Sequence, residues 1–483
     1  ADPQREPTQT DKGPPKVGAI SVGRTQSEQQ TTEGVVANRA GQVLLAHTLL
    51  KSGTSFGSRV LFTPQEQDPS FVHPGAALAC SLDSYAHVPP PLHLSDHFPG
   101  CQNLKLKPLI DGAPNFRKID GLPVYGVAIP TVLGLRNVLS QLGITAKNGR
   151  RLVWVNLREE PLIYVNGSPY VVRESDKPFA NLEYSGIDAA RVVEMEERLK
   201  ADVLAEASLY DGSVLVAHED DQFQVVEDWE PVTEVDVQTP LEVYEELTRD
   251  GFNVHYVRVP ITDEKAPMGD DFEVLMRNAW DLDEKGEDKG DKGDKGEEEE
   301  LEPGRSSSSS SSSTAAIIFN CQMGRGRTTT GMVIACCILL RKAQGHLAPP
   351  PALPRESFPA WWCSQEDFSD LASPKAGATG NPAEDLKNGM FLSIRSVMRA
   401  LENGKSAKMA LDLILDACAA MQNLREAIAT YRKRVFLEPN EIRRQSLLQV
   451  CLEYLDRYYS LIVFAAYLDD PGFAFGTSSH VPF

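Results

Sequence analysis

The chain has 483 residues, enough for two or three domains with a sizeable hydrophobic core. Apolar residues make up 41% of it and charged residues 24%, as in ordinary soluble proteins, and no run of eighteen apolar residues predicts a transmembrane helix. The formal net charge of −20 argues against binding to nucleic acid or to an anionic membrane surface.

The first 94 residues are predicted to be a polar lead-in followed by an insertion. Residues 1–34 are polar and lack hydrophobic periodicity, which is typical of a disordered or extended segment. Residues 53–94 are rich in turn formers and include three consecutive prolines at 89–91. We therefore expect the folded domain to begin at about residue 95.

From residue 121 the apolar pattern alternates between strands and helices, which predicts an α/β domain. Asn166-Gly167 is a strong signal for a hairpin turn. The strands are predicted at 152–157, 162–165, 170–173, 213–217 and 254–259. The helices are predicted at 188–209, 240–250 and 272–280.

The loop that follows the strand 254–259 offers a candidate general acid. A basic leaving oxygen needs a proton, and a carboxylic acid on such a loop can supply it. We assign this role to Asp263, with Glu264 as the second choice. The alternative is that Asp263 caps the helix beginning near Asp270 or is an ordinary turn carboxylate.

Residues 281–314 form a low-complexity segment. Residues 281–302 hold twelve acidic residues and four lysines, for a net charge of −8, and eight serines follow at 306–313. Such a segment cannot bury apolar surface, so we expect a solvated linker that loops out of the domain.

A phosphate cradle is predicted where a strand-like run at 315–320 ends at Cys321, which begins a Cys-x5-Arg motif. Two glycines let successive backbone N–H groups turn inward as an anion nest, and the helix predicted from Gly331 points its positive end at the same place. A cysteine at such a site has a pKa of roughly 3.5–7.5. Arg327 can grip two phosphate oxygens. The predicted phosphate-binding residues are Gln322, Met323, Gly324, Arg325, Gly326 and Thr328.

The spacing Cys-x5-Arg recurs at 451–457, where it predicts something different. No glycine separates Cys451 from Arg457, and the segment lies in an apolar helical run, so it cannot form a nest. We interpret Cys451 as a buried small hydrophobe. Context, rather than spacing, therefore distinguishes the first motif, for which the alternative is a strand-to-helix turn whose cysteine merely packs.

The last third of the chain is predicted to be helical. Residues 346–383 read as a proline-rich insertion, 384–469 as a helical extension and 470–483 as a tail. Helices are predicted at about 385–403, 407–433, with a possible break, and 440–468. Six residues of the last helix keep helical spacing and are predicted to be core: Leu447, Leu448, Cys451, Leu452, Leu455 and Tyr459.

An acidic chain that binds a phosphate ester needs a locally positive pocket. The candidate cations besides Arg327 are Arg325, Lys265, Arg258 and Arg158. The alternative for each of these four is a solvated or salt-bridged surface residue.

The cradle, the acid loop and their surroundings resemble the paladin family, a branch of the cysteine phosphatases related to the PTP-like phytases. The resemblance implies a cysteine-phosphatase domain over 95–345, with a central mixed sheet flanked by helices, and a mostly helical extension. It also implies Cys321 as nucleophile, Arg327 as phosphate ligand and Asp263 as acid. Since members usually carry several such repeats, we expect further repeats in a longer chain. The matching stretches are GLPVYGVAIPTVLGLRNVL (121–139), VWVNLREEPLIYVNGSPYVVRE (153–174), TPLEVYEELTRDGFNVHYVRVPITDEKAP (239–267), FNCQMGRGRTTTGMVIA (319–335) and MQNLREAIATYRKRV (421–435).

Two features depart from the family pattern. Asn320 precedes the cysteine where active tyrosine phosphatases usually have histidine; asparagine carries no charge, so we expect Cys321 to be less acidic than in those enzymes. More than forty residues also separate the segments 47–52 and 96–103, which should follow each other almost directly.

The expected function is hydrolysis of phosphate monoesters, first of inositol phosphates or phosphoinositides and second of phosphotyrosine in phosphoproteins. The alternative is a pseudophosphatase, a phosphate-binding signalling scaffold, and the helical extension could serve either as an interaction platform. Eight irregularly spaced cysteines form neither a disulfide framework nor a zinc motif, so we expect a reducing cytosol and no metal or cofactor.

Overall fold

The computed structural model describes residues 93–95, 106, 109–172, 182–219, 225–283, 315–347, 386, 388–476 and 480–483. The predicted lead-in, the acidic and serine-rich linker and the proline-rich insertion lie almost entirely outside these residues.

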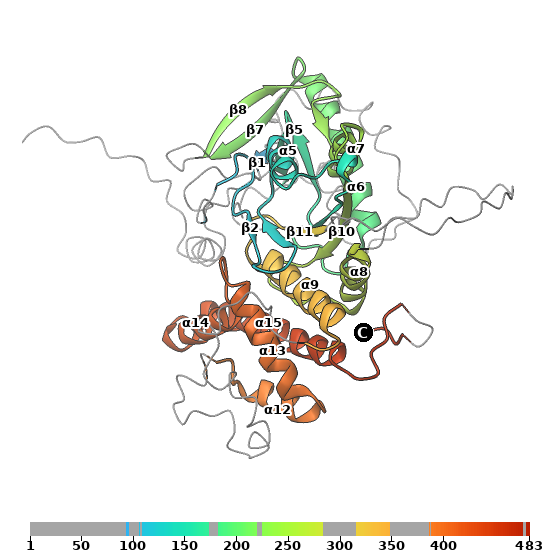
Figure 1. Cartoon of the computed structure of the whole chain (residues 1–483). Coiled ribbons are helices and arrows are strands. Elements are labelled where there is room, and N and C mark those ends of the chain that lie inside the picture. Colours follow the sequence, from blue (N-terminus) through green and yellow to red (C-terminus); the bar gives the residue numbers. More distant parts are fainter. Residues whose placement is uncertain are drawn as a thin grey trace, which may run out of the picture.

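A mixed sheet, five-stranded in the part of the chain that the structure describes, lies at the centre of the molecule (Figure 1). Its order is β10 (Val254–Ile261), β4 (Leu152–Arg158), β11 (Ala316–Asn320), β3 (Val124–Val127) and β2 (Arg117–Lys118). The first four strands are parallel, and β2 is antiparallel to β3. The C-terminal ends of β10, β4 and β11 therefore meet at one edge, as binding sites of open α/β sheets require.

Helices cover both faces of this sheet, because alternate residues of its strands are apolar on both sides. In β11, Ile318 packs in the cluster that contains α5 (Val132–Gln141) and α7 (Pro240–Arg249). Ile317 and Phe319 pack instead with α8 (Gly269–Trp280) and α9 (Gly326–Gln344). The predicted α/β class with a central mixed sheet is confirmed. Among the described residues, Ala146–Asn148 and Asp281–Asp283 are short 3-10 helices.

A second sheet lies beyond α5. Its order, among the described strands, is β8 (Val225–Pro231), β7 (Ser213–Glu219), β1 (His93–Ser95), β6 (Ser168–Val171), β5 (Leu162–Val165) and β9 (Val237–Gln238), and α6 (Ala189–Leu209) packs on it. The hairpin of β5 and β6 is confirmed, with positive φ at Asn166 (48°) and Gly167 (76°).

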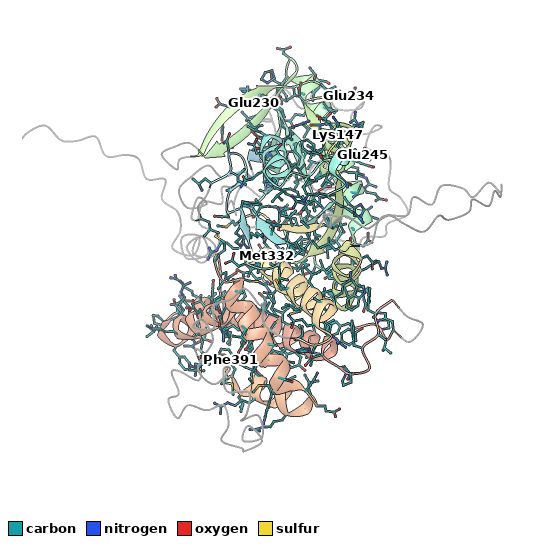
Figure 2. All side chains as sticks on the ribbon, in the orientation of Figure 1. Lys147, Glu230, Glu234, Glu245, Met332 and Phe391 are labelled. Carbon is teal, nitrogen blue, oxygen red and sulfur yellow. The ribbon has the colours of Figure 1, made fainter. Side chains whose placement is uncertain are left out.

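Strand β8 was not predicted from the sequence. Its sequence, VVEDWEP, contains three acidic residues and a proline, which are uncommon in strands, and its residues 227–229 are exposed. Figure 2 shows Glu230 and Glu234 at this end of the molecule, far from Phe391 in the helical extension.

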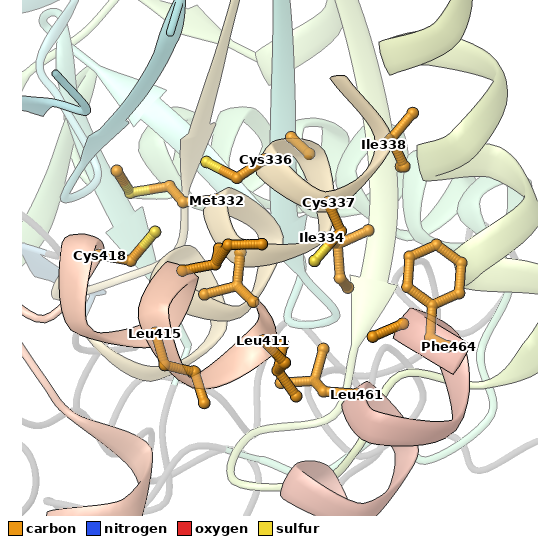
Figure 3. Close-up of a cluster of buried hydrophobic side chains, with 14 of the residues drawn as sticks. Met332, Ile334, Cys336, Cys337, Ile338, Leu411, Leu415, Cys418, Leu461 and Phe464 are labelled. Carbon is orange, nitrogen blue, oxygen red and sulfur yellow. The ribbon is translucent and has the colours of Figure 1, made fainter. Parts of the chain in front are cut away.

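The helical extension consists of α12 (Leu392–Ala400), α13 (Gly404–Ala417), α14 (Leu424–Leu437) and α15 (Glu441–Leu468), which lie beneath α9 (Figure 1). The predicted break between 407 and 433 falls at 418–423. Met332, Cys336 and Cys337 of α9 lie among side chains of α13 and α15 (Figure 3). Because α9 is buried on nearly all sides, the sheet and the extension share one hydrophobic core.

The predicted core stripe of α15 is partly wrong. Cys451 is buried as expected, but Leu448, Leu452 and Tyr459 are 44%, 49% and 42% exposed. The helix packs through an adjacent stripe that includes Tyr454, because its orientation is set by contacts with α13 and α14. None of the described helices is long and apolar enough to span a membrane.

Candidate active site

The cradle is the turn between β11 and α9. Gly324 has φ +68°, and a Cβ there would lie 2.6 Å from the backbone nitrogen of Ala128, so only glycine fits. The backbone N–H groups of Gly324 and Thr328 donate to the Cys321 sulfur. This is the inward-facing arrangement that the sequence predicts.

Two hydrogen bonds hold the cradle from behind. The carbonyl of Met323 accepts from Asn115 Nδ2 at 3.0 Å, and the carbonyl of Gln322 accepts from the Ile129 N–H at 2.9 Å. Because these carbonyls accept hydrogen bonds from neighbouring segments of the same chain, the N–H groups of the turn can face the pocket.

Helix α9 begins at Gly326, five residues before the predicted start at Gly331. Arg327 and Thr328 therefore lie in its first turn, where the N-terminal partial charge is strongest. Thr330 Oγ1 donates to the Gly326 carbonyl at 3.0 Å, which lets a threonine-rich run enter the helix.

Cys321 has the environment of a stabilised thiolate. Its residue is only 4% exposed, and burial alone would raise the pKa of the thiol. The charge of Arg327, the Thr328 hydroxyl and the N–H groups of Thr328 and Gly324 act in the opposite direction, so the pKa of Cys321 falls below its ordinary value. Thr328 Oγ1 donates to the sulfur at 3.1 Å.

Asn320 takes part in a neutral network beside the nucleophile. Its Oδ1 accepts from Trp154 Nε1 at 2.9 Å, and its Nδ2 donates to Asn156 Oδ1 at 3.4 Å. Asn320 thus fixes the end of β11 through its amide, and it adds no positive charge beside Cys321.

Glu160 orients Arg327, a contact that sequence reasoning missed. Arg327 Nη1 and Nη2 donate to its two carboxylate oxygens at 3.0 and 3.1 Å, and Nη1 also donates to the Ile261 carbonyl at 3.1 Å. Arg158 Nε lies 3.3 Å from the same carboxylate. Among the described residues nothing bonds Arg327 Nε. The edge formed by Nε and Nη2 is therefore the part of the fork that can take phosphate oxygens.

A signal for Glu160 was present in the sequence. It follows the end of β4, which neighbours β11 in a parallel sheet, so both strands deliver their next residues to the same edge. The run Arg158-Glu159-Glu160 could therefore have been predicted to lie at the sheet edge that bears the cradle, where its charged groups can contact Arg327.

Asp263 and Glu264 both line the pocket. Asp263 Oδ2 lies 3.6 Å from Arg327 Nη2. Glu264 has the unusual φ of +67°, and its Oε1 accepts from the Tyr454 hydroxyl at 3.4 Å. The capping alternative for Asp263 is wrong, because the start of α8 is capped by Asp271, whose Oδ2 accepts from the Met268 N–H at 2.8 Å.

Glu159 lies beneath the acid loop with a carboxyl that resists ionisation. Burial, followed by the charge of Glu160, raises its pKa from 4.5 to about 7. The Thr262 hydroxyl donates to Glu159 Oε2 at 2.7 Å, which ties this carboxyl to the residue before Asp263.

Of the four candidate cations besides Arg327, the structure brings Arg325 into the pocket but not Lys265, Arg258 or Arg158. The ammonium of Lys265 pairs with Glu183, and the buried Arg258 pairs with Glu196 and donates to the Arg158 carbonyl. Among the described residues that line the pocket, the candidate cations are Arg325 and Arg327, together with one that was not predicted, Arg457.

The helical extension supplies one wall of the pocket. Gln422 follows α13, and Tyr454 and Arg457 project from α15. Their contribution could not be found from the sequence, because they lie about one hundred or more residues after the cradle and no local pattern marks them.

The chain is similar to one family model and to several known proteins. Residues 155–339 match the family model of the PTP-like phytases, described as inositol hexakisphosphate. The chain is also similar to the paladins of Xenopus tropicalis (26% identical over 359 residues), Gallus gallus (28% over 360) and Homo sapiens (27% over 361). These alignments cover 73% of this chain and 33–34% of each relative, so the chain spans about a third of their length. The predicted resemblance to the paladins is confirmed.

Two solved structures are similar to part of the chain. One is the PTP-like myo-inositol phosphatase from Mitsuokella multacida in complex with myo-inositol-(1,3,4,5)-tetrakisphosphate, at 20% identity and a TM-score of 0.30, covering 46% of this chain and 29% of that one. The other is a PTP-like phytase from Bdellovibrio bacteriovorus, at 19% identity and a TM-score of 0.29, covering 46% and 62%.

Proposed function

We propose that this chain, which is similar to the paladins and matches the PTP-like phytases over residues 155–339, hydrolyses phosphate monoesters through a phosphocysteine on Cys321. The observation that carries the proposal is the Cys321 sulfur held by inward N–H groups beside the oriented Arg327. A buried cysteine with no chemical role would have a raised pKa, as Cys336 and Cys337 do.

The first chemical step transfers the phosphoryl group to sulfur. The Cys321 thiolate attacks phosphorus, the bond from phosphorus to the ester oxygen breaks, and Asp263 protonates the leaving oxygen. The nest N–H groups and the Nε–Nη2 edge of Arg327 hold the equatorial oxygens, so catalysis is mainly positioning and electrostatic stabilisation.

The second step regenerates the thiolate. Water attacks the phosphorus of the phosphocysteine while Asp263, now ionised, takes a proton from it. The bond from sulfur to phosphorus breaks, and inorganic phosphate leaves. Glu264 is the second choice for the proton-transfer role, since it lines the same pocket.

Inositol phosphates or phosphoinositides are the leading substrates, and phosphotyrosine is second. The family match to the PTP-like phytases supports this order, as do three arginines in one pocket of an acidic chain. We further propose a cytosolic location, since a reducing compartment keeps Cys321 as a thiol.

A phosphate-binding pseudophosphatase is the second candidate, and Asn320 favours it because no positive charge takes the place of the histidine usual in active tyrosine phosphatases. Thiol reactivity separates the two. At about pH 6, iodoacetamide should alkylate Cys321 before Cys336, Cys337 or Cys451, whose thiols have raised pKa values, and vanadate should block the reaction. Peptide mass spectrometry identifies the labelled site.

The decisive measurement is phosphate release from a panel of inositol phosphates, phosphoinositides and phosphotyrosine peptides by the wild-type chain and by Cys321→Ser. Phosphate release by the wild-type chain but not by Cys321→Ser would support the proposed phosphatase activity. Reactive, vanadate-protected Cys321 without release from any ester would instead favour the pseudophosphatase.

A further inference from the structure

Arg457 is a buried cation with an unused hydrogen-bond donor at the active site. The residue is 1% exposed, yet its side chain lines the pocket beside Cys321 and Arg327. Its Nε donates to the Lys265 carbonyl at 3.0 Å, and Nη2 bonds to nothing in the described part of the chain. A buried guanidinium with an unsatisfied N–H is costly unless an anion binds there.

The position of Arg457 is fixed on two sides. Its guanidinium carbon lies 5.4 Å from the centre of the Tyr454 ring, and Nε holds the backbone of the acid loop. A Cβ added to Gly326 would lie 3.3 Å from Arg457 Nη1 and 3.3 Å from Gln422 Oε1. Arg457 and Gln422 therefore sit against the first residue of α9, at the rim of the cradle.

The phosphoryl group that reacts does not need this arginine. The cradle and Arg327, whose Nε bonds to nothing among the described residues, already lie around Cys321. Arg457 comes from a different part of the chain. Its donor is surplus for a simple monoester and suits a second anionic group on the same substrate.

We propose that Arg457, flanked by Gln422 and Tyr454, binds a second phosphate of the substrate, adjacent to the scissile one. The helical extension would thereby select polyphosphorylated rings over simple monoesters. A cation is needed there, because the carboxyl groups of Asp263 and Glu264 line the same pocket and would repel a second phosphate whenever they are ionised. The inference rests on the proposed function for the identity of the reaction, but the binding site itself can be tested without turnover.

Binding to the Cys321→Ser chain tests the proposal. Titration calorimetry with myo-inositol hexakisphosphate and, separately, inorganic phosphate should be done on Cys321→Ser and on Cys321→Ser/Arg457→Gln. We expect Arg457→Gln to weaken hexakisphosphate binding about 10–100-fold and phosphate binding less than about 3-fold. Arg444→Gln, on the exposed end of α15 and paired with Glu441, is the matched control and should change neither.

Arg457→Met keeps the packing on Tyr454 and removes the charge, so it decides the question if the glutamine variant does not fold. Equal losses for the two ligands would overturn the proposal, since Arg457 would then serve the reacting phosphate or the fold. Unchanged hexakisphosphate binding would also overturn it. If the wild-type chain releases no phosphate from any ester but shows Arg457-dependent binding, the proposed function fails and the second-phosphate site stands.

Discussion

The chain contains the spacing Cys-x5-Arg twice, and the two copies form different structures. At 321–327 glycine at positive φ lets the backbone curl around the sulfur, whereas 451–457 is a continuous part of α15. The pKa of Cys321 is lowered by Arg327 and by N–H donors despite burial, while burial raises that of Cys451. The spacing itself thus says little about a cysteine, and backbone conformation decides its chemistry.

The arginines of the two copies, unlike the cysteines, lie at the same site. Arg327 and Arg457 line one pocket although 130 residues separate them. Arg327 arrives there through local structure, the first turn of α9, and Arg457 through the packing of the helical extension against α9. A segment with no local mark of a site can still complete one.

The two Cys-x5-Arg copies should differ most in the effect of replacing their cysteine. Cys321→Ser should lower turnover by about 10⁴–10⁶-fold, because serine cannot provide a low-pKa nucleophile in the same nest. Substrate binding should persist, as calorimetry can measure.

Cys451→Ser is the matched control. Its hydroxyl can replace the weak contact of Cys451 Sγ with the Ile428 carbonyl at 3.7 Å, so turnover should stay within about 2-fold of wild type. Comparable turnover by Cys321→Ser and the wild-type chain would show that the nucleophile lies elsewhere.

The next effect concerns the arginine of the cradle. Arg327→Lys should lower kcat roughly 10³–10⁵-fold, nearly as much as Arg327→Ala. A lysine ammonium cannot bond both oxygens of Glu160 and still present an edge to phosphate. Steady-state kinetics on one ester measures both variants. If the lysine variant kept most of its activity, Arg327 would contribute only its positive charge and not its planar geometry.

Asp263 gives a smaller and substrate-dependent effect. Asp263→Asn should slow hydrolysis of alkyl phosphates, such as inositol esters, by roughly 10²–10⁴-fold, because their leaving oxygen is strongly basic. The rate for an aryl phosphate with an acidic phenol should fall little, since the phenolate leaves without being protonated.

The comparison with Glu264→Gln identifies the acid. Equal losses on both esters for Asp263→Asn would indicate a structural role, and a larger loss for Glu264→Gln on the alkyl ester would move the acid to that residue. Glu264 is held by Tyr454 of the extension, whereas Asp263 faces Arg327 of the cradle.

The smallest expected effect is on the pH dependence of stability, which should differ between the cradle region and the helical extension. Glu159 near the cradle has its pKa raised from 4.5 to about 7, whereas the largely buried Asp412 of the extension is matched by Lys408 at 2.5 Å and Arg425 at 3.3 Å. The folded chain holds a proton on Glu159 that the unfolded chain has lost, so this contribution to stability disappears as pH rises through about 4.5 to 7.

Glu159→Gln cannot ionise and keeps an acceptor for Thr262. From pH 5 to pH 8, its free energy of unfolding should therefore rise relative to wild type by about 1–3 kcal/mol. Urea unfolding at both pH values measures the difference, with the exposed Glu245→Gln as control. A constant difference across this range would mean that Glu159 is ionised throughout.

Local chemistry determined much of this protein from its sequence. Glycines that permit positive φ, an Asn-Gly turn and apolar runs on both faces of strands predict the cradle, the hairpin and the parallel sheet, because each depends on neighbours in the chain. Parallel strands also bring Cys321 and Asp263 to one edge, since both follow strand ends.

Only the tertiary structure decided which charged residues reach the pocket. Lys265 turns to Glu183 and Arg258 to Glu196, while Arg457 enters from a helix that carries no motif. A side chain's partner depends on which element packs beside it, and the rotation of α15 about its axis is set by contacts with α9, α13 and α14. Such long-range packing leaves no local pattern, so the sequence by itself predicted the cradle around Cys321 but not the pocket wall, from the helical extension, that faces it.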